Sequence, residues 1–335
     1  MHARYTTFCA LLIAALLAGC GGAENEDPLA QVPREEGLQE RVADAQQVDP
    51  ADFESADGRT LQEIVDAYQA TPDAAALATS VFTVGENRLA FGTIDQQARF
   101  VYGDSVVYVA EGFDRPAYGP FVAPADVLVT APAFRSEQAA AESDPFAAVY
   151  GATVKMRKAG PHVVLTVTKT GDGQIVAATR TVEVSTKQGD PIPDVGERAP
   201  KVETDTLASA GGVVERIDTR QPPSDMHEDS FDEVVGKKPV ALLFATPQLC
   251  QSRVCGPVVD VALQLRERYG DQVTFIHQEV YAGNDPAKGL RKPLTEFKLR
   301  TEPWLFVVGE DGRISARLEG SFGLRAFEDA VKTAL

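Results

Sequence analysis

The sequence predicts two folded domains in series, an all-β sandwich followed by an α/β domain in roughly the last third of the chain. Apolar and polar residues alternate with a period of two over much of 79–186, as expected for half-buried strands. A continuous apolar run at 240–245 lies between turn residues, which is typical of a central strand covered on both faces. Behind that run, apolar residues recur at helical spacing. The length of 335 residues suits two domains and a linker.

Residues 1–20 have the pattern of an export signal. His2 and Arg4 precede an apolar run at 8–17 that is too short to span a bilayer. The sequence Leu-Ala-Gly-Cys at 17–20 matches the lipobox and so resembles bacterial lipoproteins. The resemblance implies acylation of Cys20 and a lipid-anchored protein at the extracytoplasmic face of the cell membrane. The alternative is a plain secretory signal in which Cys20 is incidental.

The next segment, 21–57, predicts a disordered acidic tether. It holds eleven Asp and Glu residues against Arg34 and Arg41 and has no sustained apolar period, so it buries too little apolar surface to offset its ordering entropy. A short helix is expected within 58–78, where apolar residues recur at helical spacing. These residues are Leu61, Ile64, Val65 and Tyr68.

The segment 79–186 predicts the β-sandwich. Turn residues rich in Gly, Pro and Asp separate its alternating runs. Its last part, 152–184, resembles the final strands of immunoglobulin-like modules in bacterial envelope proteins, which implies an immunoglobulin-like sandwich. The sequence leaves the function of this domain open. The runs are 88–92, 105–109, 153–156, 163–167 and 175–184.

Residues 187–235 are predicted to be a linker with an opening segment for the last domain. The sequence from Gly196 to Pro200 resembles the Gly-x-x-Ala-Pro motif with which redoxins begin, and a short helix is expected at 230–235.

The α/β domain is predicted over 236–335. The order strand, helix, strand, helix, hairpin, helix resembles that of the thioredoxin superfamily, which implies a thioredoxin-like fold. The hairpin turn is expected at Glu310-Asp311-Gly312. The expected elements are strands at 240–245, 273–280, 304–308 and 314–318 and helices at 258–269, 290–299 and 324–335.

Two cysteines remain for chemistry. Of the four in the chain, Cys9 leaves with the signal and Cys20 takes the lipid, so Cys250 and Cys255 are left. A close pair in an oxidising compartment is expected to form a disulfide at least part of the time. In an unbroken helix, residues five apart have Cα atoms about 8.5 Å from each other, whereas a disulfide tolerates roughly 7 Å. We therefore expect the helix to begin near Pro257, with both cysteines in the preceding loop.

Two further segments resemble thioredoxin landmarks. Residues 244–246 resemble the strand end before the redox cysteines, and 301–306 resemble the segment with the family's cis-proline, here Pro303. The spacing C-x4-C replaces the usual CxxC, as in thioredoxin-like lipoproteins of the actinobacterial type, which this chain resembles. The resemblance implies thiol-disulfide exchange with exported protein partners, carried by Cys250, Cys255 and Pro303.

The roles of the two sulfurs are a separate expectation. Cys250, directly after the strand end, is the preferred nucleophile and Cys255 the resolving thiol, with the reverse assignment left open. The helix N-terminus and Arg253 are expected to lower the thiol pKa. Glu302, which precedes the proline, is implied to help bind the substrate backbone.

Three other interpretations stay open. In one, the pair is a permanent structural disulfide in a non-catalytic binding scaffold. In another, His277 joins the two cysteines and Met226 or His227 in a copper site. In the third, the sequence 252–255, Ser-Arg-Val-Cys, approximates a peroxiredoxin motif. His162 is expected at the surface, in a turn.

The composition excludes one class of partner. The chain has 32 Lys and Arg residues against 49 Asp and Glu, a formal net charge of −17, whereas binding to nucleic acid needs clustered basic residues. We therefore expect no nucleic-acid partner, and in the preferred interpretation no cofactor or metal.

Overall fold

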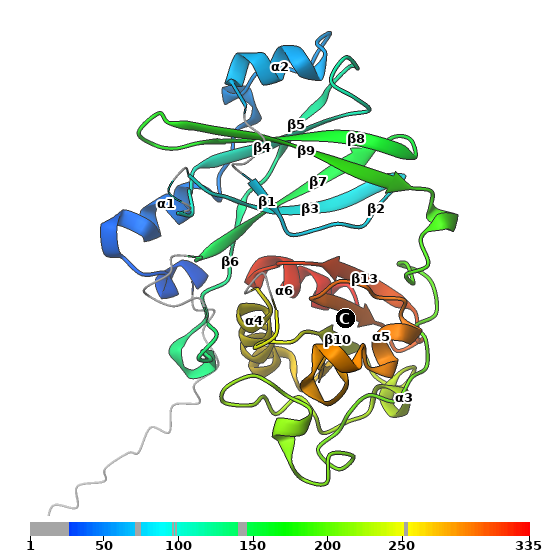
Figure 1. Ribbon diagram of the computed structural model, residues 1–335. Coiled ribbons are helices and arrows are strands. Elements are labelled where there is room, and N and C mark those ends of the chain that lie inside the picture. The colour runs from blue at the N-terminus through cyan, green and yellow to red at the C-terminus, as the bar shows by residue number, and fades with distance from the viewer. Residues whose placement is uncertain (1–26, 71–74, 96, 98, 140–145, 251–253) are drawn as a thin grey trace, which may run out of the picture.

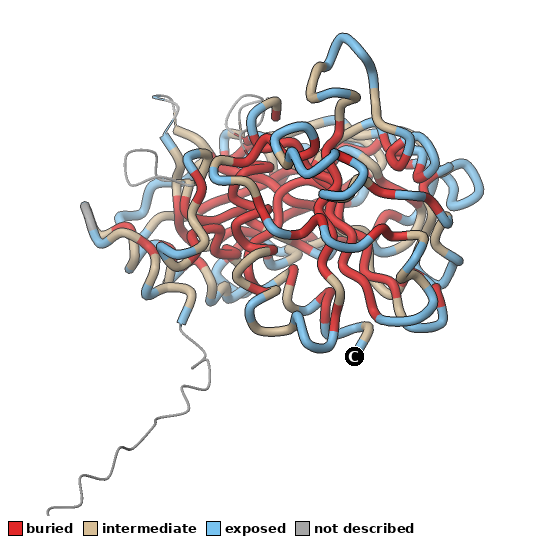
Figure 2. The backbone as a smooth tube through the Cα atoms, turned by 90° about the horizontal axis from the view of Figure 1, so that it is seen from below, coloured by how far each residue is buried: buried red, intermediate tan, exposed pale blue. Residues whose placement is uncertain are grey.

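The structure is a computed structural model that describes residues 27–70, 75–95, 97, 99–139, 146–250 and 254–335. It contains a β unit of two sheets and an α/β unit built on a third sheet (Figure 1). Figure 2 shows that the buried residues gather in the interior strands, while exposed positions follow the surrounding loops. None of the helices in the described ranges has the length and apolar character needed to cross a membrane.

The β unit is a sandwich of two packed sheets. Its strands are β1 (Ala75–Leu77), β2 (Phe82–Thr83), β3 (Gly85–Thr93), β4 (Asp104–Ala110), β5 (Tyr118–Val122), β6 (Ala125–Val127), β7 (Ala148–Met156), β8 (Gly160–Lys169) and β9 (Ile175–Ser185). One sheet has the order β2-β9-β8-β4-β5 and the other β1-β3-β7-β6. Val107 of β4 and Tyr150 of β7 belong to one hydrophobic core between the sheets. Successive side chains of a strand point to opposite faces, so Tyr108 lies on the outer face instead.

The helix α2 (Leu61–Tyr68) covers that outer face and lies within 58–78, where the sequence predicted a short helix. A capping box starts it: the Thr60 hydroxyl accepts from the Glu63 N–H at 3.4 Å, and the Glu63 carboxylate accepts from the Thr60 N–H at 2.8 Å. Leu61, Ile64 and Tyr68 are buried against the sheet.

The prediction of a disordered tether over 21–57 is wrong for the described part, 27–57. This part contains the helix α1 (Leu38–Asp44), and Leu38, Val42 and Ala45 are buried in the core of the sandwich. The Ala45 carbonyl accepts a hydrogen bond from the Ala125 N–H of β6 at 2.8 Å. These three residues recur at i, i+4 and i+7, the spacing of one helical face, but the acidic residues between them masked the pattern.

The α/β unit has a four-stranded sheet in the order β11-β10-β12-β13. β10 and β11 are parallel, and β12 is antiparallel to β10 and β13. This topology, with a helical crossover between the two parallel strands, confirms the thioredoxin-like fold. The elements are α3 (Phe231–Val234), β10 (Val240–Phe244), α4 (Cys255–Tyr269), β11 (Thr274–Gln278), α5 (Lys292–Glu296), β12 (Trp304–Val308), β13 (Ile314–Glu319) and α6 (Leu324–Lys332).

Both faces of this sheet are covered, which explains the continuous apolar run of β10. Leu243 packs on the face under α4 and α6, and Leu242 packs on the opposite face with Phe231 of α3 and Leu294 of α5. Strands buried on both faces need apolar residues at every position.

The segment 187–235 is part of the α/β unit, in contrast to the predicted linker. Ile192 and Val202 lie in the core under α3 and α5, and the Met226 carbonyl accepts a hydrogen bond from the His277 N–H of β11 at 3.0 Å. The segment therefore covers the edge of the sheet. Its irregular backbone hid this from a periodicity analysis.

The described residues also include short 3₁₀ helices. These are η1 (Pro28–Gln31), η2 (Glu35–Gly37), η3 (Pro50–Asp52), η4 (Pro132–Phe134), η5 (Lys187–Gly189), η6 (Val214–Arg216), η7 (Ala282–Asn284) and η8 (Pro286–Lys288).

Buried polar contacts join the two units. The Asp126 carboxylate of β6 accepts three backbone N–H groups from the start of α6, at 2.8, 2.9 and 3.1 Å. The Glu319 carboxylate of β13 accepts the N–H groups of Ser80 and Val81 at 3.0 and 2.9 Å. Since unsatisfied buried charges are strongly unfavourable, these contacts fix the position of the β unit on the α/β unit.

Candidate redox site

Cys250 and Cys255 lie between the end of β10 and the start of α4. After β10 the chain makes a turn in which the Thr246 carbonyl accepts the N–H groups of Leu249 and Cys250 at 3.2 and 3.1 Å. Cys255 is the first residue of α4. Residues 251–253 lie outside the described residues, so the roles predicted for Ser252 and Arg253 do too.

The prediction that the helix begins near Pro257 is wrong by two residues. Val254 already has helical backbone angles, with φ −86° and ψ −19°. The first four N–H groups of a helix have no intrahelical partner, so a proline at the third position removes no hydrogen bond. Cys250 nevertheless stays outside the helix, and this lets the two sulfurs approach.

The two thiols contact each other. Their side chains are hydrogen-bonded, and they are not linked by a disulfide in this structure. Cys255 is fully buried, whereas 9% of Cys250 is exposed. The arrangement is thus a dithiol with one outer and one inner sulfur.

The environment of Cys255 opposes ionisation. Burial raises the pKa of the Cys255 thiol well above its ordinary value, the hydrogen bond and the charge of Cys250 raise it further, and the backbone of Thr246 lowers it slightly. The prediction of a lowered pKa is therefore wrong for this sulfur. The dipole at the helix N-terminus does favour a thiolate, but the loss of hydration on burial outweighs it.

Glu302 and Pro303 immediately precede β12, whose Trp304 pairs with Phe244 at the end of β10. The Glu302–Pro303 peptide bond is cis, as the sequence predicted. Burial raises the pKa of the half-buried Glu302, and the charge of Cys250 adds to the effect. Burial also raises the pKa of Tyr281, to which Glu302 and both cysteines contribute. Tyr281 is thus close enough to Glu302 and the cysteines for their charges to affect it, and no role was predicted for it.

Part of the β unit covers the first turn of α4. A Cβ atom added at Gly256 would lie 2.6 Å from both the Cβ and the carbonyl oxygen of Gln138. Gln138 follows β6, and its side-chain oxygen accepts the Gln221 N–H at 3.1 Å. Only glycine at 256 permits this approach, which helps to keep Cys255 away from water. The contact joins residues far apart in the sequence, so no local pattern predicted it.

Asp260, on the next turn of α4, holds the same segment. Its carboxylate accepts the Ser136 N–H and hydroxyl, both at 3.0 Å, and pairs with the Arg220 guanidinium at 2.9 Å. Arg220 also donates to the Phe134 carbonyl at 2.7 Å. Burial raises the pKa of Asp260 to about 6, although Arg220 and Ser136 act in the opposite direction. We call 134–138, which these contacts hold on α4, the cover segment.

His277 does not join the cysteines, in contrast to the copper hypothesis. Within the described ranges, the group of side chains that could hold a metal ion consists of Asp218, His227 and His277, without a sulfur. Burial alone would lower the pKa of His277, but the Asp218 carboxylate holds it above its ordinary value. Although Asp218 is buried, its pKa lies well below the ordinary range because of the two histidines. Asp218 was missed because it lies in the segment predicted to be a linker.

His162 is also placed differently from the prediction. It lies in β8 with only 2% of its surface exposed, and its Nδ1 is 3.1 Å from the Gly160 carbonyl. The Gly-Pro sequence before it belongs to the strand and not to a surface turn.

Comparison with known proteins finds no matching protein-family model and no matching curated protein. Among solved structures, the chain is similar to a thiol:disulfide interchange protein DsbE from Chlorobium tepidum, with 14% identity and a TM-score of 0.31 over 42% of this chain and 98% of the other. A thioredoxin family protein from Chlorobium tepidum TLS matches with 16% identity and a TM-score of 0.30, over 41% and 94%. The fold assignment rests on the sheet order described above.

Proposed function

We propose that the chain is a membrane-anchored, extracytoplasmic thiol-disulfide exchange protein that acts on exported protein partners through Cys250 and Cys255. The observation that carries the proposal is the contact between the two thiols. They meet where β10 ends and α4 begins, beside the cis Glu302–Pro303 bond.

The exchange proceeds in two steps. The thiolate of Cys250 attacks one sulfur of a partner disulfide, so that a mixed disulfide forms and the other partner sulfur leaves as a thiolate that takes up a proton. Cys255 then loses its proton and attacks the Cys250 sulfur, which releases the second partner thiol. The partner gains two electrons and two protons, and the cysteine pair becomes a disulfide. The reverse sequence oxidises a partner dithiol.

The environments of the two sulfurs favour this assignment of roles. Cys250 is the less buried of the two sulfurs, with 9% of the residue exposed, whereas Cys255 is fully buried. A raised pKa keeps Cys255 protonated until the mixed disulfide places an electrophilic sulfur beside it. Pro303 precedes β12, whose Trp304 pairs with Phe244 at the end of β10, and in this proposal it is where the backbone of a partner binds.

The membrane anchor is the part of the proposal that concerns Cys20, which lies outside the described residues. Among the described residues, the first buried one after it is Val32, twelve positions further on. A fully extended chain of that length spans at most about 40 Å. The tether would therefore be short. Replacing Cys20 with Ser should move the protein from the membrane fraction to the soluble fraction and abolish labelling by a radioactive fatty acid.

The β unit is proposed to be an immunoglobulin-like module that contributes to the choice of partner. Its cover segment lies on the first turns of α4, so a partner that reaches the thiols also meets the β unit.

A disulfide exchange assay tests the proposal. The purified chain is compared with Cys250→Ser and Cys255→Ser in the reduction and oxidation of a model protein disulfide, and only the wild type should turn over. Cys255→Ser should accumulate a mixed disulfide, which mass spectrometry detects. A wild type no faster than both variants would show that the pair is a structural element, as would a reduction potential well below about −300 mV.

A further inference from the structure

A second buried polar cluster lies at the edge of the α/β sheet. His277 comes from β11, while Asp218 and His227 come from the segment that covers this strand. All three are at most 2% exposed. The Asp218 Oδ2 atom lies 3.0 Å from Nε2 of His227 and 3.4 Å from Nδ1 of His277. The Ser224 hydroxyl completes the group, at 3.2 and 3.5 Å from the same two nitrogens.

These distances match a metal coordination sphere. Zinc binds His nitrogen and carboxylate oxygen at about 2.0–2.1 Å in a tetrahedron, and the ligand atoms of such a tetrahedron lie about 3.3–3.4 Å apart. The four measured separations are 3.0, 3.4, 3.2 and 3.5 Å. These four of the six separations are close to those expected around one ion, and the ligand atoms of Asp218, His227 and His277 all lie within 4.8 Å of one another.

Neighbouring groups orient two of the ligands. The Asp218 carboxylate accepts the backbone N–H of Arg220 through Oδ1 at 2.8 Å and the backbone N–H of Ser224 through Oδ2 at 2.7 Å. The outer nitrogen of His277, Nε2, lies 3.1 Å from the Ala245 carbonyl. A hydrogen bond from the outer nitrogen to a carbonyl fixes the tautomer of a metal-binding histidine, so that the inner nitrogen presents its lone pair.

The second histidine has a spare nitrogen. Nδ1 of His227 is buried and has no hydrogen-bond partner within the described residues. The contacts of the ring are therefore made through Nε2. That nitrogen faces Asp218 and Ser224.

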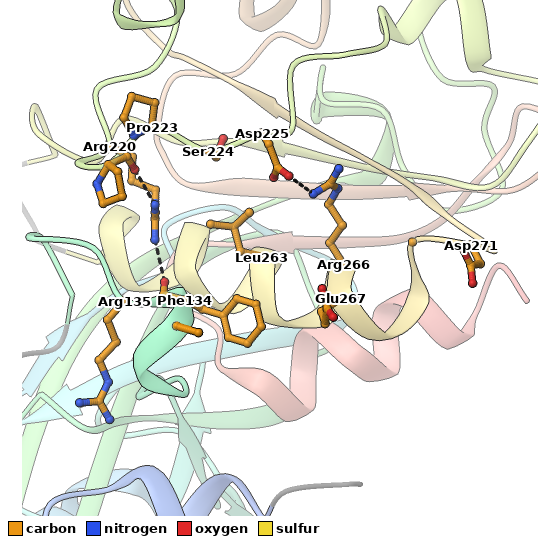
Figure 3. A pocket seen from close by; sticks show the side chains of 13 residues that line it. Phe134, Arg135, Arg220, Pro223, Ser224, Asp225, Leu263, Arg266, Glu267 and Asp271 are labelled. Carbon is orange, nitrogen blue, oxygen red and sulfur yellow. Dashed lines mark hydrogen bonds and ion pairs between the residues drawn. The ribbon is translucent and has the colours of Figure 1, made fainter. Parts of the chain in front are cut away.

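One member of the cluster, Ser224, also lines a surface cavity. Ser224 lines a polar cavity of about 610 Å³ beside α4, together with Arg220, Asp225 and Arg266 (Figure 3). In the close-up, Asp225 pairs with Arg266 of α4, and Ser224 lies between Arg220 and Asp225. Ser224 thus links the cluster to this cavity, although it is itself buried.

We propose that Asp218, His227 and His277 form a binding site for a divalent zinc ion, with the fourth position at Ser224. Imidazole and carboxylate ligands in a tetrahedral arrangement suit Zn²⁺, whereas Cu(I) prefers thiolates and thioethers. The site is distinct from the thiol pair, because no cysteine belongs to the group. Binding replaces the protons that the histidines share with the carboxylate in the metal-free chain.

The test uses the metal-free full chain and two probes. Calorimetric titration with Zn²⁺ should show one equivalent bound. Addition of Co²⁺ should produce the intense visible bands of a tetrahedral N/O site, without the charge-transfer band of a thiolate ligand. Asp218→Asn keeps the shape of the side chain but removes the anionic ligand, and should weaken Zn²⁺ binding on the order of 100-fold or more. His227→Gln should do the same.

Two controls make the outcome decisive. The double variant Cys250→Ser, Cys255→Ser should bind Zn²⁺ as the wild type does, and so should His162→Gln, which removes a buried histidine far from the cluster. Circular dichroism shows whether each variant is folded. If the wild type binds no stoichiometric ion or gives no tetrahedral Co²⁺ spectrum, the proposal is wrong whatever the variants do. It is also wrong if binding is lost only with the cysteines.

Discussion

The replacement of Asp260 by Asn makes a quantitative prediction about the contact between α4 and the β unit. Only 1% of Asp260 is exposed, and its partners are Arg220 and Ser136. Its pKa is raised from the ordinary value of 3.8 to about 6, mainly by burial. A folded-state pKa above the unfolded one means that the folded chain holds this proton more tightly. The stabilisation from Asp260 is therefore complete below about pH 4 and is lost as the pH rises through about 6.

The size of the effect follows from the two pKa values. The gap between 3.8 and about 6 corresponds to about 3 kcal/mol at about 1.36 kcal/mol per pH unit. Most of this change falls in an accessible range, with about 2 kcal/mol between about pH 4.5 and about pH 7. Asn does not titrate, so the wild type minus Asp260→Asn difference in the free energy of unfolding should fall by this amount as the pH rises.

Urea denaturation at a series of pH values measures this difference. Taking the difference between the two proteins removes the contribution of all other titrating groups that behave alike in both. Ser136→Ala provides a second check, because it removes a hydroxyl that donates to the ionised carboxylate. The midpoint of the transition should then move to higher pH. A difference that stays flat, or that rises with pH, would refute the account of a carboxylate whose burial outweighs its ion pair.

Three further replacements test the site and the junction between the units. Gly256→Ala places a Cβ 2.6 Å from Gln138, so it should lower the free energy of unfolding by about 1–3 kcal/mol and speed alkylation of Cys255. The control Gly171→Ala, with no atom within 4 Å of the added Cβ, should change neither quantity. Glu302→Gln removes a negative charge that raises the pKa of Cys255, so the pH profile of Cys255 alkylation should move to lower pH. An unchanged profile would contradict the interaction between Glu302 and Cys255. Asp126→Ala leaves three N–H groups at the start of α6 without their acceptor. The free energy of unfolding from urea denaturation should fall by about 2–4 kcal/mol, whereas a fall below about 0.5 kcal/mol would show that water replaces the cap.

The α/β unit was predictable because its signals are local. The apolar run of β10 and the helical spacing along α4 each arise from residues a few positions apart. By contrast, α1 and the segment 187–235 were assigned to tether and linker. Their burial depends on contacts with strands far along the chain, such as Ala45 with Ala125 and Met226 with His277. A periodicity analysis has no access to such contacts.

At the candidate site, the sequence predicted which residues come together better than it predicted their environment. The cis bond before Pro303 and the approach of Cys250 to Cys255 agree with the sequence-based expectation, but the raised pKa of Cys255 does not. That pKa depends on how completely water is excluded, and part of the exclusion comes from Gln138 of the other unit. Likewise, Asp218 and His277 are close only because the 187–235 segment lies against β11.

The position of the cover segment connects the fold to the proposed chemistry. In-line attack on a disulfide requires that the partner sulfur reach Cys250 directly, yet only 9% of this residue is exposed and Cys255 is fully buried. The cover segment lies against Gly256, the residue after Cys255, and is held on α4 through Asp260. A partner must therefore either fit against the cover segment or displace it, and displacement breaks the buried contacts of Asp260. The rates of exchange with small disulfides and with folded protein partners should therefore depend on different residues. We expect exchange with a folded protein to respond to changes at Ser136 and Gln138, whereas exchange with a small disulfide should depend mainly on the two cysteines.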